Sequence, residues 1–291
     1  MADMEKGTYV RTTAIDQLVD SFLASTVSEK KQIISLGAGT DTRYFRLMSR
    51  YAAHQVPNWI YHEMDFAENA ARKVQAIKKY SELAAGMRTP THVASQNGQE
   101  CIAVGPHYRL HPIDLRTLDP EKAPPTSFES IDPALPTIIL SECCLCYLAP
   151  AAADAVALYF TKHLFPPDAP LGLIVYEPIK PFDAFGKTMV ANLATRGIVL
   201  QTLKKYGNLE AQAARMRAYG LTNTRGSDIN GLWKHAVSEE EKKRVASLEM
   251  VDEVEEWELL AGHYCVTWAW KENPQRACFE TLDKWIASYE S

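Results

Sequence analysis

Five short apolar runs in the sequence each end at residues that suit a binding site. They are followed by Gly37-Ala38-Gly39, by Asp65, by Asp114 and Leu115, by Glu142 and by Glu177. In an open parallel sheet the carboxyl ends of the strands meet at one edge, and ligands bind beyond it. Glycines let the backbone approach a flat ligand, and carboxylates accept hydrogen bonds from hydroxyl and amino groups. The pattern predicts a ligand site at this edge, although each acid, taken alone, has the alternative role of a helix cap.

The residues around the glycine turn indicate which ligand fits. A dinucleotide fingerprint requires a third glycine where the chain has Thr42, and Asp41 would repel a pyrophosphate at the start of the next helix. NAD is therefore disfavoured. Asp65 ends the next apolar run and is placed to accept hydrogen bonds from both hydroxyls of a ribose. S-adenosylmethionine has a ribose and an adenine but no phosphate, and Arg11 would bind its carboxylate.

Helices alternating with strands must position these residues. Apolar runs predict strands over 32–36, 59–64, 107–114, 137–140 and 171–176, with helices over 14–25, 44–51, 70–77 and 152–164 between or before them. This alternation is typical of a doubly wound parallel sheet. Thr13-x-x-Asp16 resembles a capping box, so we expect the first helix to begin there and Arg11 to lie just outside it.

The remaining segments are predicted from turn residues and later periodicity. We expect an irregular connection over 84–106 and a proline-rich surface loop over 119–136. The last third is more helical: Phe185, Met189, Val190 and Leu193 share one helical face, and Ser238-x-x-Glu241 resembles a second capping box. Residues 263–268 alternate as a late antiparallel strand does.

Composition and charge exclude several classes of protein. With 46% hydrophobic and 23% charged residues, the 291-residue chain is not disordered. A net charge of −5 gives no positive field to hold a phosphate backbone, so we expect no nucleic-acid partner. The start lacks the apolar core of a secretory signal, and the longest uncharged apolar stretch, 143–153, is shorter than the ~20 residues that span a bilayer. We expect a cytoplasmic protein, not bound to membranes, whose six cysteines remain thiols.

The sequence gives little indication of a metal site or of a redox-active cysteine pair. Cys143 and Cys146 have the spacing of a metal or redox pair, but no second Cys or His pair with ligand spacing follows, so we interpret them as packing residues. The eight histidines show no metal spacing, and His62 and His111 receive no role. We therefore expect no metal. Structural alternatives stay open for Arg11 as an ion pair and for Tyr147 as a core residue.

Four motifs resemble those of the leucine carboxyl methyltransferase family. They are Tyr9-Val-Arg11-Thr-Thr-Ala-Ile-Asp16, Ile34-Ser-Leu-Gly-Ala-Gly-Thr-Asp-Thr42, Ser141-Glu-Cys-Cys-Leu-Cys-Tyr147 and Ser247-Leu-Glu-Met-Val-Asp-Glu253, in matching order over nearly the whole chain. The resemblance implies a class I S-adenosylmethionine-dependent methyltransferase fold, with a doubly wound, mostly parallel, seven-stranded sheet and an added helical lobe. It implies an enzyme that uses S-adenosyl-L-methionine to methylate the C-terminal leucine α-carboxylate of the protein phosphatase 2A catalytic subunit.

The resemblance also implies a role for each residue that matches a motif. At the amino-acid half of the cofactor, Arg11 would pair with the carboxylate and Glu142 would hold the ammonium group. At the nucleoside half, Gly37-Ala38-Gly39 would form the close-approach turn, Asp65 would bind the ribose, and Asp114 and Leu115 would flank the adenine. Tyr147 would orient the substrate carboxylate. An alternative role for Arg11 is to bind the acceptor carboxylate.

The resemblance further implies one methyltransferase domain over 1–291. We expect an N-terminal helix within 1–30 to cover the cofactor, residues of about 182–258 to form a helical lobe on the substrate side, and the protein to be a monomer whose partner is the phosphatase tail. Family members carry a substantial segment before the Arg11 motif, so this chain reads as N-terminally shortened, without a lid and its lysine contact. The alternatives are a related methyltransferase acting on a small molecule or a modified tRNA base, and a shortened form that binds without turnover.

Overall fold

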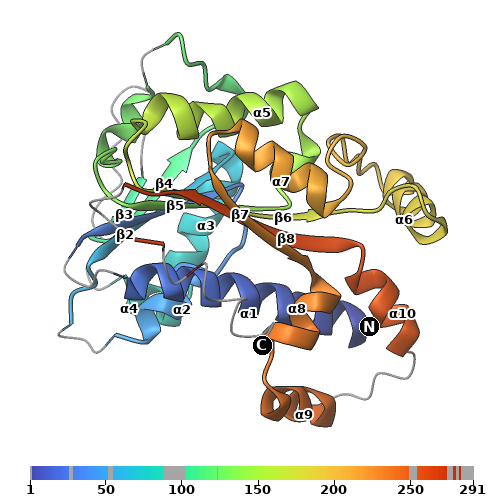
Figure 1. Ribbon diagram of the computed structural model, residues 1–291. Coiled ribbons are helices and arrows are strands. Elements are labelled where there is room, and N and C mark those ends of the chain that lie inside the picture. The colour runs from blue at the N-terminus through green and yellow to red at the C-terminus, as the bar shows by residue number, and fades with distance from the viewer. Residues whose placement is uncertain are drawn as a thin grey trace.

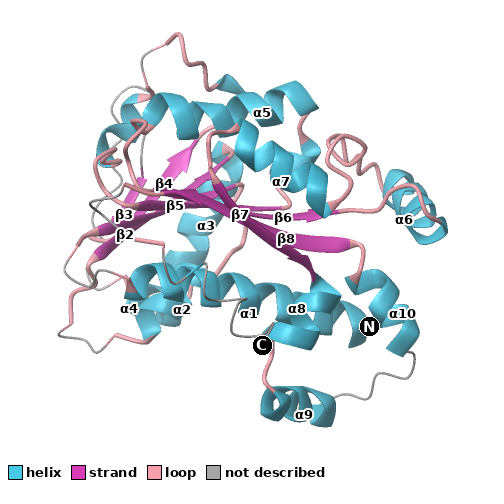
Figure 2. Ribbon diagram, viewed as in Figure 1, coloured by secondary structure: helices cyan, strands magenta, loops and turns pink. Residues whose placement is uncertain are grey.

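One twisted sheet of eight strands runs through the molecule, with helices on both faces (Figures 1 and 2). The structure is a computed structural model that describes residues 2–25, 29–51, 55–87, 102–122, 124–248, 254–273, 278–279 and 282. The strands are β1 (Lys31–Leu36), β2 (Trp59–Asp65), β3 (Ile102–Gly105), β4 (Tyr108–Pro112), β5 (Thr137–Glu142), β6 (Leu171–Pro178), β7 (Asn223–Asp228) and β8 (Tyr264–Lys271). Their order is β3-β4-β2-β1-β5-β6-β8-β7.

The predicted doubly wound, mostly parallel sheet is confirmed. Strands β4, β2, β1, β5 and β6 are parallel, whereas β8 runs antiparallel to both β6 and β7. Six of these strands match predicted ranges; β7, which completes the seven that the resemblance implied, lies in the segment expected to be helical. Strand β3 adds an eighth as an antiparallel partner of β4. Because β3 is too short for a periodic pattern, its segment was expected to be irregular. That segment also contains the end of helix α4 (Ser81–Gly86), and residues 88–101 lie outside the described residues.

Helices pack on both faces of the sheet and enclose two hydrophobic cores. One face carries α1 (Ala2–Ala24), α2 (Arg43–Ser49), α3 (Ala67–Lys79), α4 and α8 (Ile229–Ala236), and the other carries α5 (Pro150–Leu158) and α7 (Leu209–Ala218) (Figure 1). The predicted helix 152–164 is α5, continued by a π-helical turn over Tyr159–Leu164. Short 3₁₀ turns span Leu115–Thr117, Thr126–Ser130 and Leu145–Tyr147.

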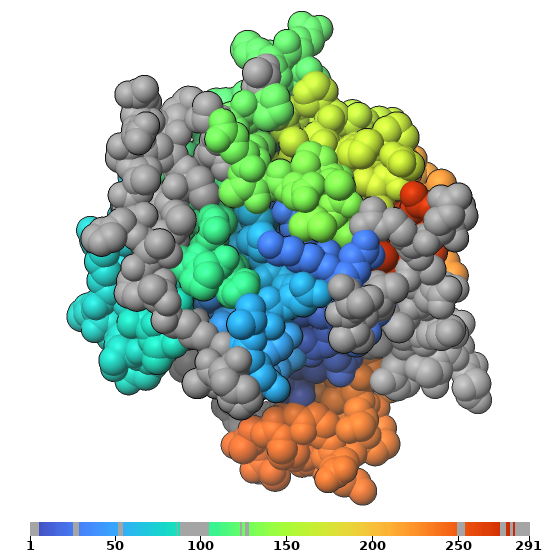
Figure 3. Space-filling view, turned by 90° about the vertical axis from the view of Figure 1, so that its left-hand side faces the viewer, coloured from blue at the N-terminus to red at the C-terminus, as the bar shows by residue number. Residues whose placement is uncertain are grey.

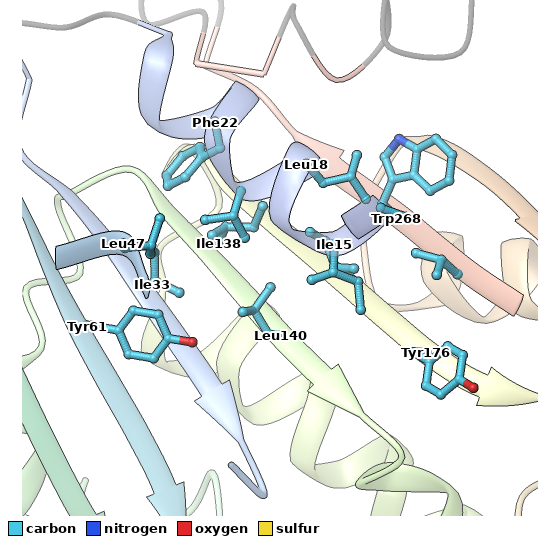
Figure 4. Packing of buried hydrophobic residues seen from close by; sticks show 14 of the residues in the cluster. Ile15, Leu18, Phe22, Ile33, Leu47, Tyr61, Ile138, Leu140, Tyr176 and Trp268 are labelled. Atoms are coloured by element: carbon cyan, nitrogen blue, oxygen red, sulfur yellow. The ribbon is translucent and has the colours of Figure 1, made fainter. Parts of the chain in front are cut away.

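The first helix is longer than the sequence indicated. Helix α1 begins before Thr13, so the predicted start at a capping box is wrong, and Arg11 lies within the helix. Asp16 does not cap; its carboxylate accepts a hydrogen bond from Arg43 Nε at 2.8 Å. The predicted apolar stripe is buried, and Ile15, Leu18 and Phe22 pack against sheet residues such as Ile138 (Figure 4). Tertiary contacts, not local capping, therefore fix this helix.

The segment expected to be a helical lobe is only partly separate from the sheet. Helix α6 (Ala184–Thr195) stands away from the sheet, but β7 is a sheet strand and α7 packs against it (Figure 1). Ser238 Oγ accepts a hydrogen bond from Glu241 N at 3.2 Å, which is one half of the predicted capping box, whereas the Glu241 carboxylate accepts from Arg244. It opens α9 (Glu239–Leu248), which projects from the lower edge of the molecule (Figure 3).

The last described elements follow the sequence closely. Helix α10 (Val254–Ala261) leads into β8, the predicted late strand. Of the motif Ser247–Glu253, residues 249–253 lie outside the described residues. Among the helices that the structure describes, none combines the length and the apolar character needed to cross a bilayer.

A buried histidine pair links β2 and β4. His62 Nδ1 and His111 Nε2 lie 3.0 Å apart, and both side chains are fully buried. Burial, then the neighbouring His111 and Arg109, hold the pKa of His62 well below its ordinary value. The folded protein therefore keeps His62 neutral while the unfolded chain takes up a proton below the usual histidine pKa.

We predict that acid destabilises the protein partly through His62. Below about pH 6.5 the unfolded state alone binds this proton, so the free energy of unfolding should fall by up to about 1.4 kcal/mol per pH unit from this group. Urea unfolding at about pH 7.5, 6.5 and 5.5 should show a shallower fall for His62→Gln than for the unchanged protein. The exposed His235→Gln serves as control. Equal slopes for all three proteins would contradict the prediction.

Candidate functional site

A polar cavity of about 320 Å³ opens at the carboxyl ends of β1 and β5. Its walls come from the turn after β1, the start of α2, Arg11 and Thr12 on α1, and Glu142 at the end of β5. The cavity lies where the sequence placed the ligand, at the point where strand order reverses on either side of β1. Arg11, Gly37, Ala38 and Glu142 of the predicted residues line it directly.

The glycine turn has a conformation that favours glycine. Gly37 and Gly39 have positive φ angles of 61° and 48°. Gly39 N donates to Asp65 Oδ2 at 2.7 Å, so the acid after β2 fixes the turn after β1. The other oxygen of Asp65 accepts from Phe66 N at 2.7 Å and from Asn69 Nδ2 at 2.8 Å. The structure thus brings Asp65 and the glycine turn together, as predicted.

A buried arginine that the sequence interpretation missed, Arg43, is part of the cavity wall. The Arg43 side chain is 2% exposed, and its guanidinium donates to Asp16 at 2.8 Å, to Asp41 at 2.8 Å and to Glu142 at 2.6 Å. Burial lowers the pKa of Arg43, but the surrounding acidic groups, led by Tyr61 and Glu142, outweigh burial and hold it well above the ordinary value. Arg43 therefore stays charged and binds three elements together.

Arg11 stands between two cavities. Its side chain is 30% exposed, its Nε lies 3.6 Å from Glu142 Oε2, and its guanidinium lies 5.2 Å from the centre of the Tyr176 ring. The Nε atom is buried without a hydrogen-bond partner. The guanidinium also lines the polar cavity, where it is placed to bind an anion.

The second cavity is mostly apolar and has a volume of about 250 Å³. It lies between α1, α8, α10 and the ends of β6 and β8, and Arg11 contributes to its wall. The other lining residues are Gly7, Thr8, Cys143, Tyr176, Ile229, Trp257, Leu260, Ala261 and Tyr264. The rings of Tyr176 and Tyr264 stack with their centres 5.4 Å apart. An apolar cavity with a guanidinium in its wall suits a small apolar group that carries a carboxylate.

Asp114 and Leu115 follow β4 at the same sheet edge, outside the polar cavity's lining. Asp114 caps the short turn Leu115–Thr117 and binds Arg116, whose hydrogen bonds lower the pKa of the carboxyl. Leu115 is buried. Since β4 lies beside β2, and β2 beside β1, the residues after these three strands form a row that runs away from the polar cavity.

Tyr147 lies close to the second cavity without lining it. Its side chain is 44% exposed, and its carbonyl accepts a hydrogen bond from Gln201 Nε2 at 2.6 Å. Burial, followed by nearby Cys143, raises the pKa of Tyr147 to about 12, and Tyr264 of the second cavity adds to this rise. The hydroxyl therefore remains protonated at neutral pH and is able to donate a hydrogen bond.

Glu177 does not belong to the site. The expectation that it joins the other strand-end acids is wrong, and it is not a helix cap either. Its Oε2 accepts from Arg215 Nη1 at 2.8 Å and from Gln212 Nε2 at 3.1 Å, in a buried ion pair beneath α7. The side chain thus points to the sheet face opposite Tyr176, as alternation along a strand requires.

The cysteines near the site are thiols. Cys143, Cys144, Cys146 and Cys265 are free thiols, the Cys278 thiol donates to Glu29 Oε2 at 3.7 Å, and Cys101 lies outside the described residues. Burial, then Asp65, raises the pKa of Cys144 to about 12, which leaves it protonated and unreactive. Within the described part of the chain, no three His, Cys, Asp or Glu side chains are grouped to hold a metal ion.

Comparisons with known proteins give sequence relatives over most of the chain. A sequence model described as leucine carboxyl methyltransferase matches residues 1–160. Leucine carboxyl methyltransferase 1 of Aspergillus fumigatus is 52% identical over 287 residues, covering 92% of this chain and 72% of the relative. The protein of that name from Schizosaccharomyces pombe is 41% identical, with 93% and 82% covered.

A solved structure also resembles the chain. A putative methyltransferase from Thermobifida fusca superposes with a TM-score of 0.53 at 15% identity, covering 93% of this chain and 82% of that one. Such low identity shows a likeness of fold alone. The fold is the class I S-adenosylmethionine-dependent methyltransferase fold that the sequence predicted.

We predict that Gly37 tolerates no side chain. A Cβ added there would lie 2.7 Å from Cys144 Sγ, whereas one at Gly39 would meet only a carbonyl oxygen at 4.0 Å. Gly39→Ala should cost about 1–2 kcal/mol of unfolding free energy from backbone strain alone. Gly37→Ala should cost about 1–3 kcal/mol more because of the clash. Denaturant unfolding measures both, and Cys144→Ala should restore part of the added loss. Equal losses in the two variants would contradict this account.

Proposed function

The chain belongs to the leucine carboxyl methyltransferase family, and on that premise we propose that it methylates the α-carboxylate of the C-terminal leucine of the protein phosphatase 2A catalytic subunit. The methyl donor is S-adenosylmethionine. The observation that carries the proposal is the position of Arg11 in the walls of both a polar and an apolar cavity. A donor site and an acceptor site must adjoin in this way for a methyl group to pass directly between them.

The polar cavity suits the amino-acid half of the cofactor. Glu142 supplies a carboxylate for the ammonium group, and the guanidinium of Arg11, which lines the same cavity, supplies donors for the carboxylate. The nucleoside half then extends along the row of strand ends, with Asp65 at the ribose and with Asp114 and Leu115 at the adenine. The order of β1, β2 and β4 supports this assignment, because it matches the order of the chemical groups in the cofactor.

The second cavity suits the leucine of the acceptor. Its apolar lining would bury the isobutyl side chain, while Arg11 at its wall would attract the terminal carboxylate. Tyr147, protonated and half-exposed nearby, would orient that carboxylate through its hydroxyl. Thr8 on α1 and Trp257 on α10 also line this cavity.

Methyl transfer to a carboxylate requires the protein to position the acceptor oxygen and does not require acid–base catalysis. A C-terminal carboxylate has an ordinary pKa of about 3.5 and is ionised at neutral pH, so its oxygen needs no general base. S-adenosylmethionine, when bound, supplies an electrophilic methyl group on a sulfonium. The chain's residues hold the acceptor oxygen in line at about 3 Å and exclude water.

A protein acceptor also needs a surface around the cavity on which its body docks. We assign this role to residues of about 182–258, as the substrate-side part of a single domain in which α1 covers the cofactor. Helix α6 stands away from the sheet, and Phe182 just before it is 64% exposed (Figure 1). An exposed aromatic residue of this kind is typical of a protein-binding surface.

We predict leucine-dependent labelling. Incubation with tritiated S-adenosylmethionine and purified phosphatase catalytic subunit should label the phosphatase, and deletion of its terminal leucine should abolish the label. A tail peptide with an amidated C-terminus is the matched control, since it keeps the side chain and lacks the carboxylate. Label that persists without the leucine would refute the assigned acceptor and favour a different substrate. Cofactor binding without any label would favour a form that binds but does not turn over.

We predict that Arg11→Ala weakens cofactor affinity by about 1–3 kcal/mol, because it removes charged hydrogen bonds. Calorimetry with S-adenosylhomocysteine measures the loss, and Arg50→Gln, an exposed arginine paired with Asp20, is the control. If Arg11→Ala left affinity intact and abolished turnover, Arg11 would be reassigned to the acceptor carboxylate. Unchanged affinity and unchanged turnover would remove it from both sites.

A further inference from the structure

The carboxylate that we assign to the cofactor's ammonium group is itself held by a second residue. Glu142 Oε1 accepts a hydrogen bond from Arg43 Nη1 at 2.6 Å. Its Oε2 lies 3.6 Å from Arg11 Nε, beyond hydrogen-bond distance. Glu142 therefore has Oε2 available to the cavity, while Oε1 is fixed by the buried guanidinium of Arg43.

Arg43 joins the three elements that supply cofactor contacts. Through Asp16 it holds α1, which carries Arg11; through Asp41 it holds the glycine turn; and through Glu142 it holds the end of β5. Tyr61 on β2 adds a contact of 3.4 Å to the same Asp41 carboxylate.

The geometry of its contacts explains why this residue is an arginine. Arg46 also binds Asp16 and Arg11 lies 3.6 Å from Glu142, but of these three arginines only Arg43 contacts Asp16, Asp41 and Glu142 together, and its charge reduces their mutual repulsion. A guanidinium has donors that point in several fixed directions, so it reaches acids on different sides at once. A lysine has the same charge without that fixed geometry.

We propose that Arg43 is a positioning residue for cofactor binding: it sets the rotamer of Glu142 and the distance between α1 and the glycine turn, so that the amino-acid half of the cofactor meets a preformed site. We rest this inference on the proposed role of Glu142. Arg43 acts through Glu142, Asp16 and Asp41. Its loss should therefore weaken ligands that carry the amino-acid half and spare ligands that consist of the nucleoside half alone.

Two ligands separate these halves. S-adenosylhomocysteine has the nucleoside and the amino acid, whereas 5′-methylthioadenosine lacks the amino acid. Calorimetry on Arg43→Gln should show about a 10- to 100-fold loss of S-adenosylhomocysteine affinity and a change below about twofold for 5′-methylthioadenosine. Arg43→Lys, which keeps the charge, should recover part of the loss. Arg50→Gln, which breaks the ion pair between the residue that follows α2 and Asp20 on α1, should change neither affinity.

The double variant tests whether Arg43 acts through Glu142. In a Glu142→Gln background, Arg43→Gln should cost less affinity than it does alone, because the part of its effect that acts through Glu142 is already lost. Equal weakening of both ligands, full affinity in Arg43→Gln, or losses that multiply in the double variant would each overturn the inference. Should Arg43→Gln fail to fold, Arg43→Lys decides: unchanged S-adenosylhomocysteine affinity there overturns the positioning role. Unchanged affinity in Glu142→Gln alone would instead overturn the proposed role of Glu142.

Discussion

The contact between one buried guanidinium and three carboxylates holds the site together. Arg43 lies almost fully out of solvent at the start of α2, where the positive end of the helix dipole disfavours a cation. It is stable there because Asp16, Asp41 and Glu142 surround it. Arg46 also binds Asp16, and Arg11 Nε lies 3.6 Å from Glu142 Oε2, but Arg43 alone of these arginines contacts all three acids. Removing one partner of such a buried cluster is strongly destabilising, so the four residues function as one unit.

The same cluster explains why the first helix lies where it does. The helix interior begins well before the local capping signal, and its stripe of Ile15, Leu18 and Phe22 packs on the sheet (Figure 4). Asp16 lies on the same helix and points to Arg43. Apolar burial thus holds the helix to the sheet, while the ion pair sets its position along the strand ends. Arg11 reaches the boundary between the two cavities as a result.

Methyl transfer to a carboxylate places unusual demands on a site. The acceptor is ionised at neutral pH without assistance, and within the described residues neither cavity combines a nucleophile, a base and an orienting acid. The protein has two adjoining cavities of different polarity, and Arg11 lines both. The polar one provides fixed charges, and in the proposed arrangement the apolar one would remove water from the acceptor. Position and desolvation are therefore the means of catalysis that this geometry supports best.

Local patterns in the sequence predicted much of the architecture. Apolar runs with helical stripes between them indicated five parallel strands, and the glycine turn and Glu142 marked the edge of the sheet at which the polar cavity opens. These features depend on residues close in sequence: glycine alone adopts the positive φ at Gly37 without strain, and a parallel strand buried on both faces needs an unbroken apolar run. The four-residue strand β3 was missed because it is too short to show a period.

The direction in which each side chain points was decided by tertiary structure. Strand β6 is buried on both faces, so its sequence lacks the alternation of apolar and polar residues that would indicate which face each side chain meets. The sequence therefore did not indicate that Glu177 points away from the site and pairs with Arg215. The role of Arg43 was equally hidden, because its three partners come from different elements, one of them 99 residues away. The sequence by itself determined which strands form and where they end, since backbone geometry and apolar period act locally. Only the folded chain decided which charges meet, because pairing of buried charges depends on distances that no local pattern sets.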